Sequence, residues 1–312
     1  MHDLDPDSPV HSSLTRGDAA RLAAVILIWG LNFVVMKMGL KGLSPMLLGA
    51  LRFSIAALPI LLLVKAPKLP LRYLIGYGLA QGLGQFGLLF LALQLGMTAG
   101  MGSVVLQSQA FFTLLLAVPV LKERTLPLQW LGLTVALAGL VAIASAHGEG
   151  PGQMSLIGFI LCVGAAFMWA VSNLIGRLAA RAGHFEPFNF IVWTSLVPVV
   201  PFLLLAWWQQ GGAAVLAQLR QIDLIGAGAV IYLGLLGTLL AYSFWTQLLK
   251  RHPAGKVVPW SLLVPVVGLW AAAVAFDERP LPLQWAGTAA VLLGLLINQA
   301  AVWLRQLRFR AS

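Results

Sequence analysis

The sequence predicts an all-α polytopic membrane protein with ten transmembrane helices in two halves of five. Three observations lead to this fold class: the composition, the spacing of long apolar stretches, and a repeat between the two halves. Of the 312 residues, 60% are hydrophobic and 10% are charged, and the mean hydropathy is +0.89. A water-soluble protein of this length would need more charged residues to cover its surface. The sequence therefore predicts that most of the protein surface faces a lipid bilayer.

Ten apolar stretches follow one another along the chain. A helix that crosses the hydrocarbon core needs about 20 mostly apolar residues. Stretches of that kind are predicted at 18–40, 45–64, 71–94, 98–121, 127–146, 155–177, 187–208, 222–249, 254–276 and 282–304. Most of the connections are very short, so successive helices are expected to be antiparallel neighbours. The longest interruption, 209–221, is expected to be a loop.

The distribution of Lys and Arg predicts the orientation. The net charge of +10 does not indicate a nucleic-acid partner, because the cations occur in short clusters between apolar stretches. With the N-terminus placed in the cytoplasm, all but five of the 20 Lys and Arg residues lie at cytoplasmic helix ends. Both termini are therefore expected to be cytoplasmic, with a tail at 1–17 and a basic tail at 305–312.

A repeat relates the first half of the chain, 18–146, to the second half, 155–304. Residues 123–132 read ERTLPLQWLG and residues 278–287 read ERPLPLQWAG, an agreement at eight of ten positions with an offset of 155. Near the start of each half, Trp29 and Lys37 correspond to Trp169 and Arg177 with an offset of 140. The difference of 15 residues is assigned to an insertion in the second half, at 209–221. Pro tolerates the first helical turn and Trp the membrane interface, but such local roles do not explain agreement at a fixed offset, whereas common ancestry does.

Each half contains an odd number of helices, so the second half must enter the membrane in the opposite sense. Inverted-topology repeats are typical of transporters, in which an exchange of conformations between the halves opens a central site to each side in turn. The repeat therefore predicts transport, although it does not identify the solute.

Three segments carry a resemblance to a known family. The segments 29–53 (WGLNFVVMKMGLKGLSPMLLGALRF), 103–132 and 261–287 resemble the EamA family of the drug/metabolite transporter superfamily. The chain is most similar to the bacterial inner-membrane exporters of cysteine, O-acetylserine and related amino acids. The resemblance spans about residues 18–304. It implies an inner-membrane exporter that works by alternating access, with a cavity lined mainly by the first, third, fourth, sixth, eighth and ninth helices. The fifth and tenth helices are implied to be peripheral.

Polar and aromatic residues inside the spans are the candidate solute-binding residues, since polar groups in hydrocarbon are costly. Several share a helix face: Trp29 with Asn32, and Ser103 with Gln107, whereas Gln109 is expected on another face. The predicted substrate-binding residues are Trp29, Asn32, Lys37, Arg52, Gln81, Gln85, Gln107, Trp169, Asn173, Tyr242, Trp245, Trp260 and Ser261. For any one Gln or Asn, a hydrogen bond between helices is an equally good explanation.

Arg52 is the most informative charge because it lies about 12 Å into the second span, at 1.5 Å per residue. A guanidinium at that depth must face a cavity, backbone carbonyls or an anion. One hypothesis is that Arg52 or Lys37 attracts a substrate carboxylate while a tryptophan face receives the ammonium group. The alternative is that Arg52 binds carbonyl groups and fixes the second helix.

All ten Asp and Glu residues and all five His residues are placed in tails, loops or helix ends. Proton-driven carriers usually hold such groups at mid-membrane, so we expect facilitated export, or coupling through a helix-end group such as Glu123. The spans contain no Ser–His arrangement or aspartate pair, and the chain has no Walker A sequence. We therefore expect no enzyme activity, no catalytic residues, no metal and no cofactor. The expected partner is a small-molecule substrate, and the protein is expected to be a monomer or homodimer. The alternative function is export of drugs or other metabolites by the same fold.

Overall fold

A computed structural model describes residues 15–123, 125–148, 153–252 and 254–311. Within these residues the chain consists of helices joined by short turns, without strands. In these described ranges, nine helical stretches are long and apolar enough to cross a membrane, and Pro45–Leu61 is a shorter apolar helix. Together these ten stretches coincide with the ten predicted spans. The all-α, polytopic fold class is therefore confirmed.

The first half contains five helical spans, two of them interrupted by a change in helix type. They are α1 (Arg16–Gly39), α2 (Pro45–Leu61), the series α3 (Leu71–Tyr77), η1 (Gly78–Phe86) and α4 (Gly87–Gln94), the series α5 (Ala99–Val105), η2 (Leu106–Ser108) and α6 (Gln109–Leu121), and α7 (Pro127–Ser145). The η1 segment is a π-helix and η2 is a 3₁₀ turn.

The second half repeats this order. Its elements are α8 (Leu156–Ala182), α9 (Pro187–Leu196) with α10 (Val199–Arg220), the series α11 (Leu224–Ile231), η3 (Tyr232–Leu240) and α12 (Ala241–Arg251), the series α13 (Ala254–Val257), η4 (Val258–Leu262) and α14 (Leu263–Phe276), and α15 (Pro282–Ala311). The η3 segment is again a π-helix, and η4 is again 3₁₀. Of the predicted tails, 1–14 lies outside the described residues, whereas Thr15 caps α1 and α15 extends to Ala311.

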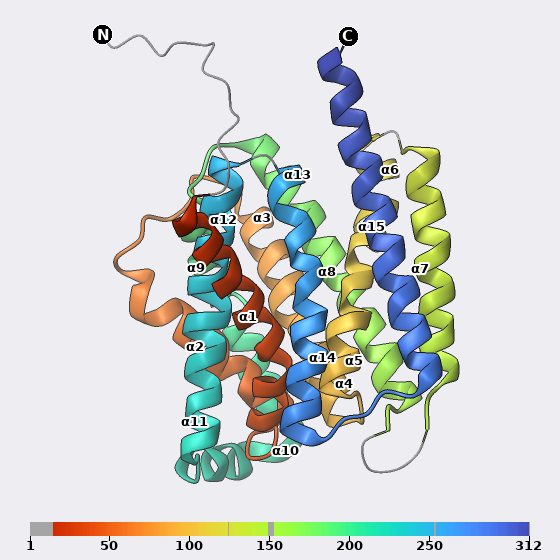
Figure 1. Ribbon diagram of the computed structural model, residues 1–312. Helices are drawn as coiled ribbons and strands as arrows, with labels where there is room; N and C mark the ends of the chain where they lie inside the picture. Colours follow the sequence, from red (N-terminus) through yellow and green to blue (C-terminus); the bar gives the residue numbers. More distant parts are fainter. Residues whose placement is uncertain (1–14, 124, 149–152, 253, 312) are drawn as a thin grey trace.

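The two ends of the helical bundle are distinguished in Figure 1, where the first residues of α1 and the last residues of α15 lie at the same end. We call this the proximal end and the other the distal end. Each half contributes helices to one continuous apolar core, which includes Met36 of α1, Phe90 of α4, Cys162 of α8 and Phe202 of α10. The two halves are therefore packed against each other and do not form separate domains.

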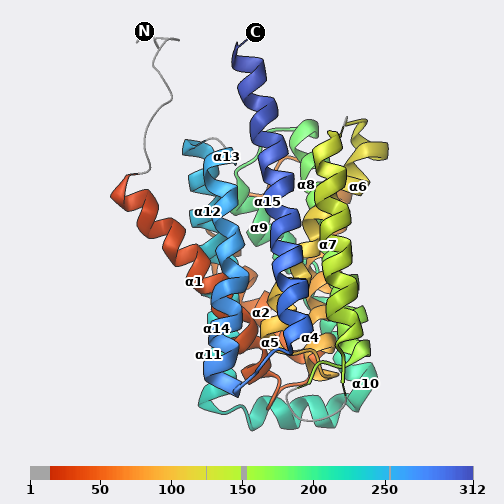
Figure 2. The same cartoon turned by 45° about the vertical axis from the view of Figure 1, so that its right-hand side comes forward.

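The prediction of a loop at 209–221 is wrong. Helix α10 bends at Gly211, where φ is +80°, and then continues to Arg220. Glycine adopts this backbone conformation without the steric cost that a Cβ atom would impose. Figure 2 shows the second part of α10 crossing the distal end of the bundle. There Gln218 accepts a hydrogen bond from the backbone N–H of Ser44 at 2.9 Å, so the insertion packs on the turn before α2.

The repeated LPLQW sequence performs the same local task in both halves. Gln129 accepts a hydrogen bond from the backbone N–H of Leu126 at 3.0 Å, and Gln284 does so from Leu281 at 2.9 Å. A side chain at this position satisfies a donor that the first helical turn leaves free. The preceding helices also end alike, since Lys122 and Asp277 both adopt positive φ angles, of 55° and 51°. The offset of 155 is thus visible in the backbone as well as in the sequence.

Helices α7 and α15 occupy equivalent places in the two halves and pack side by side at the edge of the bundle (Figures 1 and 2). Gly132 meets Gly294 and Gly139 meets Gly287, so residue numbers rise along one helix as they fall along the other. The two equivalent helices are therefore antiparallel, which is the relationship that an inverted repeat requires.

Candidate solute-binding cavity

A cavity of about 270 Å³ lies between the two halves. Small-molecule sites typically measure about 300–1,000 Å³, so this one suits a solute smaller than most drugs. Its walls come from α1, α2, the η1 and η2 regions and α8, together with η3, α12 and η4. Ten of the predicted residues line it: Trp29, Asn32, Arg52, Gln85, Gln107, Trp169, Asn173, Tyr242, Trp245 and Ser261.

Three aromatic residues form one wall of the cavity. The ring centroid of Trp29 lies 5.2 Å from that of Tyr242 and 5.5 Å from that of Trp245. The indole N–H of Trp29 donates a hydrogen bond to the carbonyl of Gly237 at 3.2 Å, which fixes the orientation of the ring. Aromatic faces in this arrangement can receive apolar groups or cations.

Arg52 is buried on another wall, with 1% of its surface exposed. Its Nε and Nη2 atoms donate hydrogen bonds to the hydroxyl of Thr238 at 3.3 and 3.2 Å. The guanidinium carbon lies 3.7 Å from the centre of the Phe86 ring, a distance at which a cation and an aromatic face attract each other. Nη1 has no hydrogen-bond partner among the described residues.

The amide side chains in and beside the cavity fall into two groups. Some are held by the protein: Asn173 donates to Gln109 at 2.8 Å, and Gln81 donates to the Tyr242 hydroxyl at 2.6 Å. In contrast, Asn32 Oδ1, Gln85 Oε1 and the amide oxygen of Gln81 are buried without a hydrogen-bond partner among the described residues. Buried polar atoms are normally paired, so the oxygens of Asn32 and Gln85, whose residues line the cavity, are candidates to accept a hydrogen bond from a solute.

Three predicted site residues lie outside the lining. Gln81 lies next to the cavity, in contact with Tyr242. Trp260 is 46% exposed and lies on η4. Lys37 forms an ion pair with Glu278. The cavity brings the other ten together.

Gln109 lines the cavity together with Gln107, although a regular α-helix would separate them. Residues two apart are about 200° apart around an α-helix, but about 240° apart in a 3₁₀ turn. The η2 turn at Leu106–Ser108 therefore brings the two amides nearer to one side. No signal in the residue types around Gln107 announces this change of helix type.

Toward the distal end the cavity is closed. Its lining residues on that side are buried, among them Met36, Leu89 and Ser103. Lys37 Nζ donates to Glu278 Oε1 at 2.7 Å, and the same carboxylate accepts the backbone N–H groups of Ala99 at 3.0 Å and Gly100 at 2.9 Å. Only 4% of the Glu278 side chain is exposed. The carboxylate thus holds the end of α1 and the start of α5 together.

Toward the proximal end the cavity is more open. The lining residues on that side, including Asn173, Trp245 and Ser261, are partly exposed. The repeat equivalents of Lys37 and Glu278, which are Arg177 and Glu123, also form an ion pair. Their side chains are 42% and 38% exposed. The two equivalent pairs therefore differ in burial.

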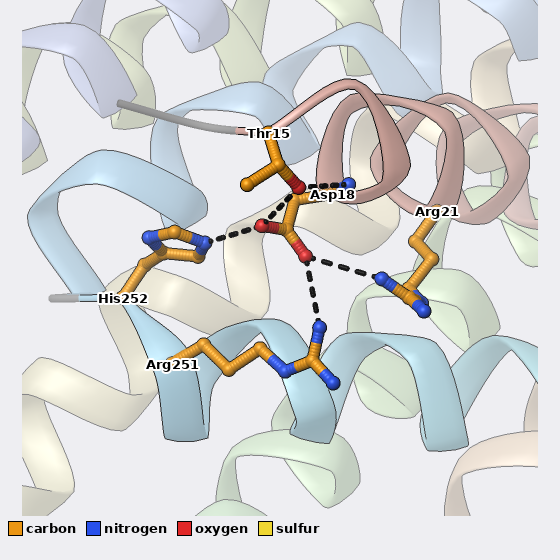
Figure 3. A network of polar contacts seen from close by, with 5 residues as sticks. All are labelled: Thr15, Asp18, Arg21, Arg251 and His252. Atoms are coloured by element: carbon orange, nitrogen blue, oxygen red, sulfur yellow. Dashed lines mark hydrogen bonds and ion pairs between the residues drawn. The ribbon is translucent and has the colours of Figure 1, made fainter. Parts of the chain in front are cut away.

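A second polar network lies at the proximal end, where α1 begins and α12 ends (Figure 3). The carboxylate of Asp18 pairs with His252 Nε2 at 3.0 Å, with Arg251 at 3.3 Å and with Arg21 at 3.2 Å. The hydroxyl of Thr15 donates to the same carboxylate at 2.8 Å. Only 3% of the side chain of Asp18 and 3% of that of His252 are exposed. Because 234 residues separate the two in sequence, sequence reasoning placed both at helix ends and missed their contact.

Among the described residues, no group of three or more His, Cys, Asp and Glu side chains is arranged to hold a metal ion. The polar groups of the cavity are amides, hydroxyls, aromatic rings and one guanidinium. These groups can bind and orient a solute through hydrogen bonds and aromatic contacts.

Comparison with known proteins agrees with this architecture. A probable amino-acid metabolite efflux pump of Salmonella typhimurium is 39% identical over 286 residues, covering 91% of this chain and 95% of the relative. The protein of the same description in Escherichia coli is 37% identical with the same coverage. A solved crystal structure matches the fold with a TM-score of 0.61 at 20% identity, covering 91% of this chain and 96% of that one. The model of the EamA-like transporter family matches residues 19–145 and 156–299. With these matches, the chain belongs to the EamA-like transporter family.

Proposed function

We propose that the protein exports amino acids and related small metabolites across the bacterial inner membrane. Two relatives that match over nine-tenths of the chain carry the description of probable amino-acid metabolite efflux pumps. The chemistry of the cavity supports the same class of solute, since it combines a guanidinium, free amide oxygens and aromatic faces. We place both termini in the cytoplasm on the distribution of Lys and Arg, so that the proximal end is cytoplasmic.

The observation that carries the proposed mechanism is the difference between the two equivalent ion pairs. Lys37–Glu278 is closed around the start of α5, whereas Arg177–Glu123 is partly exposed at the other end of the cavity. In an inverted repeat, the opposite conformation is obtained when the two halves exchange their local arrangements. The protein in this state is open toward the proximal end, and the exchange would open it toward the distal end.

The exchange has a specific form in this chain. Ala99 and Gly100, whose N–H groups Glu278 accepts, correspond to Ala254 and Gly255 with the offset of 155. In the opposite state, Glu123 would accept hydrogen bonds from the backbone N–H groups at the start of α13, and the hydrogen bonds from the start of α5 to Glu278 would be broken. A carboxylate at a helix N-terminus is stabilised by the free N–H groups and by the helix dipole. We call each such contact between a carboxylate and a helix start a carboxylate clasp, formed by Glu278 with α5 at one end and by Glu123 with α13 at the other. Only one clasp would be closed at a time.

The positions of the titratable groups bear on whether transport is coupled to proton movement. The described carboxylates and His252 lie near the ends of the bundle, and none of them lines the cavity. We propose facilitated export down the solute gradient, with the two carboxylate clasps controlling access.

The test is transport by the purified protein in proteoliposomes. Counterflow of radiolabelled solute is measured for the twenty amino acids, O-acetylserine and several cationic drugs, with proton flux recorded in parallel. Amino-acid counterflow without stoichiometric proton movement is expected. If only drugs exchanged, the amino-acid assignment would be wrong, and tight proton stoichiometry would refute facilitated transport.

A further inference from the structure

We infer that Arg52 binds the carboxylate of the transported solute and that Asn32 and the aromatic wall receive its amine. The carrier would then select α-amino acids with a free carboxylate over their esters, amides and amines. This inference rests on the proposed function and specifies the solute chemistry of the same cavity.

Arg52 carries a buried positive charge that the protein leaves partly unsatisfied. Among the described residues, five acids form ion pairs at the two ends of the bundle with partners other than Arg52, and Asp223 caps the start of α11. Burial of an ion without an opposite charge is costly. An anionic group of the solute would remove this cost when it enters the cavity, and the interaction would favour binding.

The contacts of Arg52 orient its guanidinium for this role. Thr238 accepts hydrogen bonds from Nε and Nη2, and its own hydroxyl donates to the carbonyl of Leu233 at 2.8 Å. The Phe86 ring covers one face of the guanidinium. A purely structural role, in which Arg52 ties α2 to η3, accounts for Nε and Nη2. It does not account for Nη1, which has no partner among the described residues.

The free amide oxygen of Asn32 lies close to the same segment. It is 2.8 Å from the place that a Cβ atom on Gly237 would occupy, and Thr238, the anchor of Arg52, is the next residue. Consecutive α-carbons are about 3.8 Å apart, so Asn32 Oδ1 and the guanidinium of Arg52 approach adjacent residues of η3, Gly237 and Thr238. An α-amino acid carries its carboxylate and its amine on one carbon, and a single molecule can therefore reach both.

Of the residues that the structure describes, no Asp or Glu lines the cavity, so none of them supplies a carboxylate at the amine end of the site. An ammonium group there would meet the oxygen of Asn32 and the faces of Trp29 and Trp245. Cation–π attraction and neutral hydrogen bonds are weaker than a hydrogen bond between two charged groups. Loss of the carboxylate should therefore reduce binding more than loss of the amine charge.

The experiment combines a change in the protein with a matched change in the solute. Wild-type protein, Arg52→Gln and Arg52→Lys are reconstituted, and uptake is measured for each amino acid of the panel and for its methyl ester. The ester keeps the amine and removes the negative charge. Lys41→Gln serves as the control, because Lys41 is an exposed cation at the distal end that does not line the cavity.

For the wild-type protein and Lys41→Gln, the acid should be preferred over the ester by about 10- to 100-fold, the range of one charge-assisted hydrogen bond. In Arg52→Gln, this preference should be lost because uptake of the acid falls while uptake of the ester is retained. Arg52→Lys should keep part of the preference, since it keeps the charge without the planar fork. If Arg52→Gln does not fold, Thr238→Val gives the second test, because it removes the anchor and should reduce the preference.

The outcomes separate the two proposals. If the wild-type protein carries acid and ester equally well, or if Arg52→Gln keeps the wild-type preference, Arg52 is structural and the inference is overturned while export stands. If the wild-type protein moves neither acids nor esters, the proposed function itself fails.

Discussion

Lys37 and the buried carboxylate of Glu278 form an ion pair between the two repeats, with 2.7 Å between Lys37 Nζ and Glu278 Oε1. Lys37 lies near the end of α1, in the first half, and Glu278 precedes α15, in the second half. Because the carboxylate also accepts two N–H groups at the start of α5, three segments meet at one side chain. Loss of the negative charge on Glu278 should allow the end of α1, the start of α5 and the segment before α15 to separate.

Replacement of Glu278 by Gln is expected to open the distal end of the cavity. The amide keeps one acceptor but leaves Lys37 without its opposite charge. Because the Lys37 side chain is 29% exposed, the cost should lie between the roughly 0–1 kcal/mol of an exposed pair and the roughly 3–5 kcal/mol of a fully buried one. Opening is measured by labelling a single cysteine from the distal face. Ser103→Cys in a Cys162→Ala background provides the probe, since Cys162 is the only cysteine of the chain and Ser103 is buried on the distal side.

A membrane-impermeant maleimide should label the Ser103→Cys probe at least about tenfold faster from the distal face once Glu278 is replaced. Asp277→Asn is the control, because this neighbouring carboxylate is 79% exposed in its pair with Arg279. Equal labelling rates in Glu278→Gln and Asp277→Asn would show that Glu278 does not close the cavity.

Replacement of Glu123 by Gln should affect transport without affecting the stability of the present state. Its pair with Arg177 is partly exposed, and exposed pairs contribute only about 0–1 kcal/mol. The proposed exchange, however, requires Glu123 to close the proximal end during each cycle. We expect a thermal unfolding midpoint close to that of wild type and a clear reduction in the rate of counterflow.

Glu278→Gln, assayed in parallel, should lower both the midpoint and the rate. The exchange of clasps is contradicted if Glu123→Gln exchanges solute at the wild-type rate.

The sequence was sufficient to predict the spans and the repeat, because both depend on patterns that are local or periodic. Apolar length predicted the ten helices, and the fixed offset predicted the antiparallel relationship that Gly132–Gly294 and Gly139–Gly287 display. Thirteen site residues could be proposed because polar groups in apolar helices are rare, and ten of them line the cavity.

Contacts between distant segments were beyond such reasoning. The approach of Asp18 to His252 depends on how α1 crosses α12, and no spacing rule connects positions 234 residues apart. The helical continuation after Gly211 was missed because two Gln and two Gly residues at 209–212 interrupt the apolar stretch and indicated a loop. Gln109 was assigned to the wrong face because a 3₁₀ turn has no strong sequence signature.

The network around Asp18 is expected to stabilise the proximal end. Asp18→Asn removes the charge shared by His252, Arg251 and Arg21 and leaves three basic side chains close together. The thermal unfolding midpoint should fall by several times the shift seen for Glu186→Gln, in which the lost carboxylate belongs to an exposed pair with Lys250. A double-mutant cycle with His252→Gln measures the coupling. Additive effects of Asp18→Asn and His252→Gln would contradict direct coupling of the two residues.

The contact between α7 and α15 depends on glycine at four positions, and Gly139→Ala should disrupt it. A Cβ atom on Gly139 would lie 2.6 Å from the carbonyl oxygen of Gly287, and one on Gly287 would lie equally close to the carbonyl of Gly139. Backbone atoms cannot rotate away as a side chain can, so the helices must separate. Overpacking of this kind costs about 1–3 kcal/mol.

Gly228→Ala in α11 is the matched control, because nothing lies within 4 Å of its Cβ position. There the same substitution should be neutral or stabilising by up to about 1 kcal/mol, since alanine favours a helix more than glycine does. Solute affinity should be unchanged in both variants, because no described side chain of α7 or α15 lines the cavity. The free energy of unfolding in detergent and solute binding are measured together. If Gly139→Ala were as stable as Gly228→Ala, close backbone contact would not be what holds α7 and α15 together. A loss of solute affinity in Gly139→Ala would show instead that this peripheral pair is coupled to the cavity.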